Sequence, residues 1–169
     1  MSILDDIEQI RATDPDNMYN RIFDFPEQLA EGLKISKASP LDPNDFLGIK
    51  NIVVVGMGGS AIGGDIIRSY LRSKLLVPFE ICRHYTLPEY VDDETLVIAF
   101  SYSGNTEETL AAVNDALNRK AMIVAVGSGG ILGDLAKVSE IPMANVPAGI
   151  APRAALGYLL VPMLMVFEK

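Results

Sequence analysis

Strands and helices are expected to alternate along the chain from Lys50 onward. Short apolar runs rich in β-branched residues cover residues 52–55, 79–82, 96–100 and 122–126, with a weaker run at 141–146. Segments with helical periodicity lie between them at 61–73, 107–119 and 131–138, and a last helix should run from about Pro152 through Leu164. Near-continuous apolar strands that alternate with helices are typical of a parallel sheet covered on both faces. We therefore predict an α/β fold, a three-layer sandwich with a five-stranded parallel sheet in flavodoxin-like order.

The first 48 residues differ from the rest of the chain in charge and pattern. Residues 1–48 carry 10 acidic and 4 basic residues, a net charge of −6, whereas the other 121 carry 12 and 10, a net charge of −2. Ile3, Ile7 and Ile10 have helical spacing behind Ser2, a candidate cap, and Pro26 suits the first residue of a second helix. We predict a short helical arm at 1–48 and one α/β domain at 49–169.

Composition excludes several classes of function. The formal net charge of −8 and the absence of a basic run argue against a nucleic-acid partner. One cysteine, Cys82, and one histidine, His84, cannot form an internal disulfide or a Cys/His zinc site, and this cysteine usage is typical of a reducing cytoplasm. The longest uncharged apolar stretch, 154–167, is shorter than the ~18 residues of a membrane span. We therefore expect a cytoplasmic protein with no metal site and no membrane contact.

Two loops carry the residues best suited to bind a ligand. Ligands of doubly wound sheets bind beyond the carboxyl ends of the strands, often between the first and third strands. The first strand is followed by the glycine loop (residues 56–64, GMGGSAIGG), in which Ser60 offers a hydroxyl near a helix start. The third strand is followed by the hydroxyl loop (residues 101–106, SYSGNT), directly before a helix whose free N–H groups favour an anion. Together the loops predict a site for a phosphate monoester.

Each loop alone has other interpretations. Ser and Thr often cap helices, and Gly often forms tight turns. The glycine loop also satisfies the dinucleotide pattern Gly56-x-Gly58-x-x-Ala61, but the second strand ends without the acid that would bind a ribose. NAD is therefore disfavoured as a ligand. Arg83 at that strand end leaves a phosphorylated dinucleotide as a possible ligand. The interpretation as a serine hydrolase has less support still, because neither loop contains a Gly-x-Ser-x-Gly elbow.

Arg153 stands at the entrance to the otherwise apolar last helix and needs either an anionic partner or solvent. An ordinary ion pair with one of the chain's acids is one interpretation, and neutralisation of a developing oxyanion is the other. Glu107 and Glu108 are typical of a first helical turn, so neither is assigned as a catalytic base. The same holds for Asp65 in the first helix of the domain, and His84 is assigned no role.

Three segments in combination resemble the bifunctional phosphoglucose/phosphomannose isomerases of the sugar isomerase (SIS) superfamily. They are residues 56–60 (GMGGS), 101–106 (SYSGNT) and 152–158 (PRAALGY). The arm is similar to the family's opening helices at residues 25–29 (FPEQL), so the resemblance covers essentially the whole chain. The Pro-Arg-Ala-Ala segment is the most discriminating, because the two loops occur in many SIS proteins.

The resemblance implies a cytoplasmic enzyme that interconverts glucose 6-phosphate or mannose 6-phosphate with fructose 6-phosphate through a cis-enediol, without metal or organic cofactor. Arg153 would stabilise the enediolate oxygen as charge develops in the transition state. The backbone at Gly58 and Gly59 would line the sugar site. The substrate phosphate would be held by Ser60, Ser101, Ser103 and Thr106.

This chain differs from members of the family in length. Family members have two SIS domains in one chain, and their catalytic glutamate, ring-opening histidine and lysine lie downstream of the Pro-Arg-Ala-Ala motif. Only Glu168 and Lys169 follow the last helix here, and neither lies in a matching motif. We therefore expect a second SIS domain or a second subunit, in a homodimer, to complete the site and to cover the apolar last helix. The alternative is a non-catalytic sugar-phosphate binding module with a regulatory role.

Overall fold

Five parallel strands form one sheet in the order β2-β1-β3-β4-β5 in the computed structural model, which describes residues 5–167. The strands are β1 (Asn51–Val55), β2 (Phe79–Cys82), β3 (Thr95–Ser101), β4 (Met122–Gly127) and β5 (Met143–Asn145). All four strand pairings are parallel. The predicted five-stranded parallel sheet in flavodoxin-like order is therefore confirmed.

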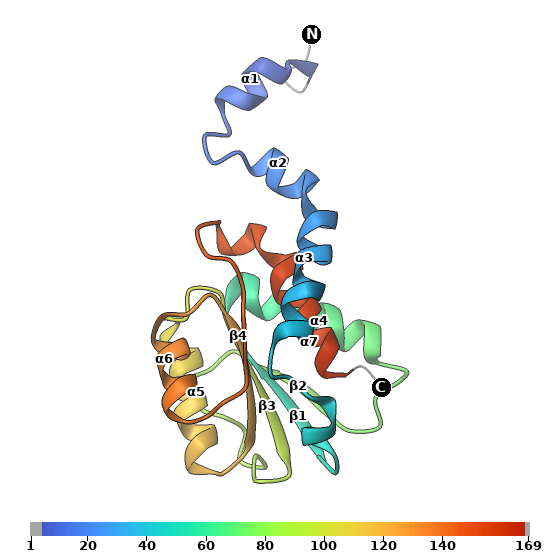
Figure 1. Cartoon of the computed structure of the whole chain (residues 1–169), viewed down its shortest axis with the longest axis vertical. Helices are drawn as coiled ribbons and strands as arrows, with labels where there is room; N and C mark the ends of the chain where they lie inside the picture. Colours follow the sequence, from blue (N-terminus) through green and yellow to red (C-terminus); the bar gives the residue numbers. More distant parts are fainter. Residues whose placement is uncertain (1–4, 168–169) are drawn as a thin grey trace.

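Helices cover both faces of this sheet (Figure 1). One face packs against α4 (Gly58–Leu71) and α7 (Leu156–Val166), and the other packs against α5 (Glu107–Asn118) and α6 (Gly130–Val138). Successive residues of β1 and β3 point to opposite faces: Val54 lies in the core under α4 and α7, and Val53 in the core under α5 and α6. Both of these side chains are fully buried.

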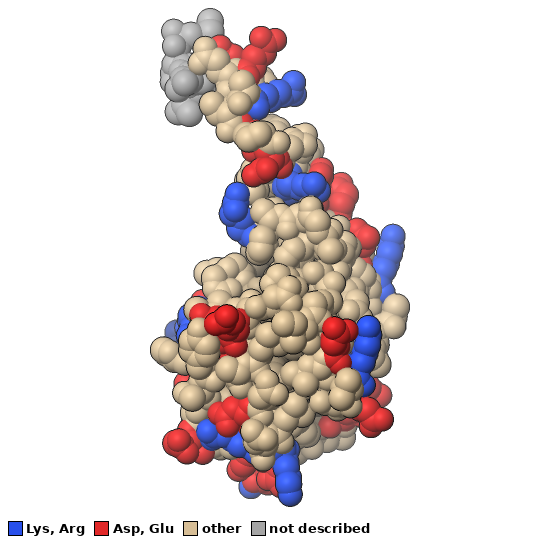
Figure 2. Space-filling view, turned by 90° about the vertical axis from the view of Figure 1, so that its left-hand side faces the viewer, with Lys and Arg blue, Asp and Glu red and all other residues tan. Residues whose placement is uncertain are grey.

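The arm consists of α1 (Ile7–Ala12), α2 (Met18–Phe23), α3 (Phe25–Ala38) and the 3-10 turn η2 (Pro43–Phe46). Helices α1 and α2 have no buried residues and project from the body as a narrow column (Figures 1 and 2). The Asp6 side chain caps α1 by accepting hydrogen bonds from the backbone N–H groups of Glu8 and Gln9, each at 3.1 Å. Ser2, the predicted cap, lies outside the described residues. Helix α3 begins at Phe25, one residue before the predicted first position, Pro26.

On the face that Figure 2 shows, acidic and basic side chains are interspersed along the arm and around the lower body, and a wide area between them is free of charged side chains.

Within residues 5–167, no helix is long and apolar enough to cross a membrane.

Three predicted boundaries were wrong for identifiable reasons. Helix α4 begins at Gly58 rather than at 61, because Met57 O accepts hydrogen bonds from the N–H groups of Ser60 and Ala61 and closes a turn inside the glycine loop. Strand β5 is shorter than 141–146, since Pro142 has no N–H to donate to the ladder. The last helix is divided into a 3-10 turn, η3 (Pro152–Ala154), and α7, so Arg153 lies on a separate turn.

Helix α7 is apolar nearly all round and lies between the sheet and α3 (Figure 1). The packing of α3 on α7 is the most extensive helix-to-helix packing among the described residues. A Cβ at Gly32 of α3 would approach Val161 Cβ to 3.1 Å, so glycine allows the two helices to lie close together. The cover expected from a second domain or subunit is thus supplied, on this side, by the chain's own arm.

Candidate functional site

The glycine loop forms the turn between β1 and α4. Gly58 has a φ of +50°, a conformation that glycine adopts without strain. The cap residue Met57 makes no side-chain hydrogen bond to the first turn of α4, which leaves the backbone N–H groups of Gly58 and Gly59 without an intrahelical partner. These groups and the helix dipole make the loop suitable for an anion or a polar ligand oxygen.

The hydroxyl loop connects β3 to α5 and contains one buried and one exposed serine. Ser101 is fully buried, and its Oγ lies 2.9 Å from Thr106 Oγ1 and accepts a hydrogen bond from Thr106 N at 3.4 Å. Ser103 is exposed, and its Oγ accepts a hydrogen bond from Asn105 N at 3.2 Å. Ser101 therefore closes the loop, whereas the Ser103 hydroxyl is accessible to a ligand.

The structure brings the two loops together, as the strand order requires. Strands β1 and β3 are neighbours, with Val55 beside Ala99 at their carboxyl ends. The buried Ser60 Oγ accepts a hydrogen bond from Tyr102 N at 3.4 Å. A Cβ at Gly56 would lie only 3.1 Å from Phe100 O, so the absence of a side chain there permits the close approach of the two strand ends.

The turn that carries Arg153 lies against the glycine loop, and the segment before it is bonded to the hydroxyl loop. A Cβ at Gly59 would lie 3.4 Å from Arg153 Cα, so the backbone of η3 borders the glycine loop directly. The Tyr102 hydroxyl donates a hydrogen bond to Pro147 O at 2.8 Å and accepts one from Ile150 N at 3.2 Å. Tyr102 thereby ties the hydroxyl loop to the segment that leads into η3. All three sequence motifs meet at one end of the sheet.

The Arg153 side chain is exposed and, within residues 5–167, makes no hydrogen bond or ion pair. The simple interpretation of Arg153 as half of an ordinary ion pair therefore finds no support in the described part of the chain. An exposed guanidinium on a turn that borders the glycine loop can bind an anionic ligand without breaking an ion pair within residues 5–167.

A third loop, residues 127–130 between β4 and α6, supports the hydroxyl loop and was missed by the sequence analysis. Ser128 Oγ donates a hydrogen bond to Tyr102 O. Asn105 Oδ1 and Gly104 O accept hydrogen bonds from the first turn of α6, from Ile131 N at 3.1 Å and Leu132 N at 2.9 Å. The signal was present, because a Gly-Ser-Gly-Gly run directly after a predicted strand follows the same pattern as the two loops that were selected.

Residues outside these loops have ordinary partners. Arg83, on which the dinucleotide alternative depends, forms an ion pair with Asp65. The Tyr158 hydroxyl donates to Glu31 Oε2 at 2.7 Å, and this hydrogen bond to a carboxylate raises the pKa of Tyr158 to about 12. Among the described residues, no group of three or more His, Cys, Asp or Glu side chains could hold a metal ion.

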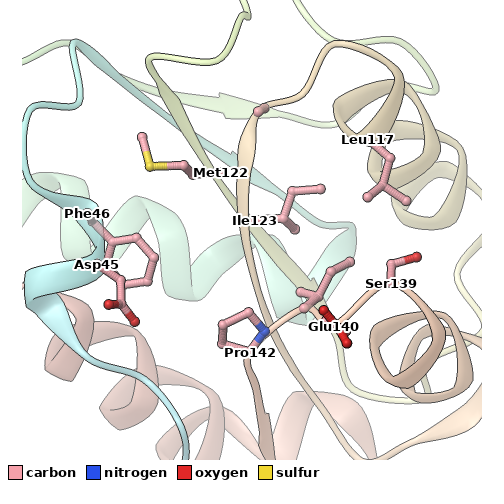
Figure 3. A pocket seen from close by; sticks show the side chains of 10 residues that line it. Asp45, Phe46, Leu117, Met122, Ile123, Ser139, Glu140 and Pro142 are labelled. Carbon is pink, nitrogen blue, oxygen red and sulfur yellow. The ribbon is translucent and has the colours of Figure 1, made fainter.

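A cavity of about 270 Å³ lies away from this site (Figure 3). Its lining includes Met122, the first residue of β4, together with Pro142 just before β5 and Phe46 of η2. It is therefore at the amino ends of the strands, opposite the loops. Figure 3 shows mostly apolar side chains there, with the carboxylates of Asp45 and Glu140 at the sides. Those carboxylates make it unsuitable for a phosphate.

The chemistry at the carboxyl end of the sheet suits an anionic ligand with several oxygens. Two helix N-termini, those of α4 and α5, begin in adjacent loops, and neither is capped by a side-chain hydrogen bond. The hydroxyls of Ser103 and Thr106 and the guanidinium of Arg153 add donors that are not fixed in the backbone. Helix N-termini and hydroxyl donors of this kind are suited to a phosphate, and a guanidinium is suited to a second negative oxygen.

The family model and the similar sequences indicate the same family. A family model described as the SIS domain matches residues 46–161. A bifunctional phosphoglucose/phosphomannose isomerase of Caldicellulosiruptor bescii is 43% identical over 152 residues, 90% of this chain and 44% of the relative. One of Thermoplasma acidophilum is 43% identical over 119 residues, 70% of this chain and 36% of the relative. The chain spans less than half the length of these relatives.

The solved structures agree with the fold. Tagatose-6-phosphate ketose/aldose isomerase from Escherichia coli superimposes with a TM-score of 0.73 at 26% identity and covers 89% of this chain and 46% of that one. The C-terminal domain of a glucosamine-fructose-6-phosphate aminotransferase from Francisella tularensis, at 20% identity, shares the fold with a TM-score of 0.70 over 88% of this chain and 46% of that one.

Proposed function

The chain belongs to the SIS-domain family, and from this premise we propose that it binds a hexose 6-phosphate between the hydroxyl loop, the glycine loop and η3. The observation that carries the proposal is the convergence of three distant segments. Tyr102 bonds to Ser60 on one side and to the segment leading into η3 on the other. A single ligand of sugar-phosphate size can therefore reach all three.

The four hydroxyls predicted to hold the phosphate divide into two roles. Ser103 is exposed and Thr106 is half-buried, and both lie at the uncapped N-terminus of α5, so they would donate to phosphate oxygens together with the first-turn N–H groups. Ser60 and Ser101 are buried, and their hydrogen bonds hold the two loops in place. The backbone of Gly58 and Gly59 would line the sugar.

The reaction we propose for the complete protein is aldose–ketose isomerisation of glucose 6-phosphate or mannose 6-phosphate to fructose 6-phosphate. A base removes the proton from C2, and the electron pair forms the C1–C2 double bond of the cis-enediolate, with the negative charge on O1. A proton then moves from O2 to O1, and the proton is returned at C1 as the C2 carbonyl forms. The exposed Arg153 guanidinium would stabilise the enediolate oxygen, a charge that is absent from the bound sugar. The names of the relatives support this reaction.

The base and the acid that opens the sugar ring would come from outside the described chain. One observation supports a second half: the chain spans 44% of the Caldicellulosiruptor relative. We propose that a second SIS domain or a second subunit supplies these groups. This chain would then contribute the phosphate-binding half of the site.

Replacement of Ser103 tests the phosphate assignment. In calorimetric titrations, Ser103→Ala should bind fructose 6-phosphate about tenfold more weakly than the wild type, because a hydrogen bond to a charged group contributes about 1.5 kcal/mol or more. The affinity for unphosphorylated fructose should not change. The exposed Ser69 on α4 provides a matched control, and Ser69→Ala should leave both affinities unchanged. Equal losses for the two sugars in Ser103→Ala would contradict the assignment.

A further inference from the structure

Helix α3 precedes the region that the family model matches, yet it contacts the segment that carries Arg153. Two side chains one turn apart on α3 bind that segment. Gln28 Nε2 donates a hydrogen bond to Ala154 O at 2.8 Å, and Glu31 accepts one from Tyr158 at 2.7 Å. The arm is therefore attached to the motif at both ends of residues 154–158.

The Gln28 amide is buried, with its N–H groups paired and its oxygen unpaired within residues 5–167. The residue is only 4% exposed, and besides Ala154 O its Nε2 reaches Arg21 O at 3.4 Å. Its Oε1 is a buried side-chain atom without a hydrogen-bond partner among the described residues. An unpaired buried amide oxygen costs stability and offsets part of what the two hydrogen bonds from Nε2 contribute.

The surroundings hold the Gln28 side chain in one position. A Cβ at Gly157 would come within 2.7 Å of Gln28 Cβ and 3.1 Å of its Oε1, so only glycine leaves room for the amide beside α7. Ala154 O belongs to the last residue of η3, next to Arg153. On its other side, η3 lies against Gly59 of the glycine loop. The turn is thus fixed between the amide of Gln28 and the backbone of α4.

We propose that Gln28 is a positioning residue that orients the turn Pro152–Ala154 and so presents the Arg153 guanidinium to the substrate. This inference rests on the proposed function, because it requires Arg153 to bind an anionic oxygen of the ligand. It adds that the arm, through one buried amide, is part of the catalytic apparatus. Loss of the Gln28 donor leaves the peptide after Ala154 held, among the described residues, only by the hydrogen bond from Ala155 N to Pro152 O at 3.2 Å, so the turn that carries the guanidinium would shift relative to the ligand.

The test is a double-mutant cycle between Gln28→Met and Arg153→Gln, measured by calorimetry. The probes are a five-carbon aldonate 5-phosphate, whose carboxylate mimics the enediolate, and inorganic phosphate. Gln28→Met should weaken aldonate binding about tenfold, the effect of one lost hydrogen bond on a positioned charge, and change phosphate binding less than twofold. In the Arg153→Gln background, Gln28→Met should have no further effect on aldonate binding. A merely structural role predicts equal losses in both backgrounds.

Two additions make the outcomes distinct. Ser36→Ala removes another buried polar side chain of α3, one that bonds Gly32 O within the helix, and should leave both affinities unchanged. Gln28→Leu replaces Gln28→Met if the latter fails to fold. If the wild type binds neither probe, the proposed function fails and this inference fails with it. If the wild type binds both and Gln28→Met loses affinity independently of Arg153, or not at all, only the inference is overturned.

Discussion

Arg153→Gln should reduce the affinity for the aldonate 5-phosphate about 100-fold, the loss typical when one donor to a developing oxyanion is removed. The affinity for inorganic phosphate should fall less than threefold, because the hydroxyl loop and the N-terminus of α5 bind the phosphate without Arg153. The free energy of unfolding should not change, since the Arg153 side chain is exposed and makes no hydrogen bond or ion pair within residues 5–167. Calorimetry and urea unfolding measure the three quantities.

Arg72→Gln is the matched control for this result. Arg72 is an exposed arginine at the end of α4, remote in sequence from all three motifs, and its removal lowers the net charge by the same amount. The Arg72→Gln variant should bind the aldonate 5-phosphate with the same affinity as the wild type. If Arg72→Gln and Arg153→Gln weaken binding equally, the effect is general electrostatics and Arg153 has no specific role.

Gly104→Ala should destabilise the protein by more than about 4 kcal/mol, the range of severe steric and backbone changes. A Cβ at Gly104 would lie 1.8 Å from Gly129 O, and Gly104 has a φ of +72°. Its carbonyl also accepts a hydrogen bond from Leu132 N at the start of α6. The hydroxyl loop and the loop at 127–130 would have to separate, so fructose 6-phosphate binding should be lost as well. Urea unfolding followed by circular dichroism measures the stability.

Gly48→Ala separates the steric clash at Gly104 from the strain of a positive φ. Gly48 has a φ of +87°, but no atom lies within 4 Å of a Cβ placed there. Its replacement should therefore cost only the backbone strain, about 1 to 2 kcal/mol. Similar losses for Gly48→Ala and Gly104→Ala would mean that the contact between the two loops is unimportant for the fold.

The strands and the adjacency of the loops could be predicted because local pattern and topology determine them. The apolar runs at 52–55 and 122–126 lie within one residue of β1 and β4. Parallel order places the loops after β1 and β3 side by side, so the contact between Ser60 and Tyr102 follows from a rule about sheets. Glycines obscured the start of α4, since their low helix propensity suggested a loop.

Contacts between distant segments could not be predicted from the sequence. The bond from Gln28 to Ala154 joins residues 126 positions apart, and nothing in the local sequence of either indicates the other. The break between η3 and α7 depends on the conformation of Ala155, which has a ψ of +14°, although the residues there are compatible with one continuous helix. The apolar character of α7 suggested a missing partner, whereas α3 packs on it.

A crystal structure of the chain soaked with fructose 6-phosphate tests the central claim most directly. The account predicts phosphate oxygens within hydrogen-bond distance, about 2.7 to 3.2 Å, of the Ser103 and Thr106 hydroxyls and of the first-turn N–H groups of α5. The sugar should extend past Gly58 and Gly59 toward Arg153. A phosphate bound anywhere else, or a loop site that takes up a dinucleotide in preference to the sugar phosphate, would contradict it.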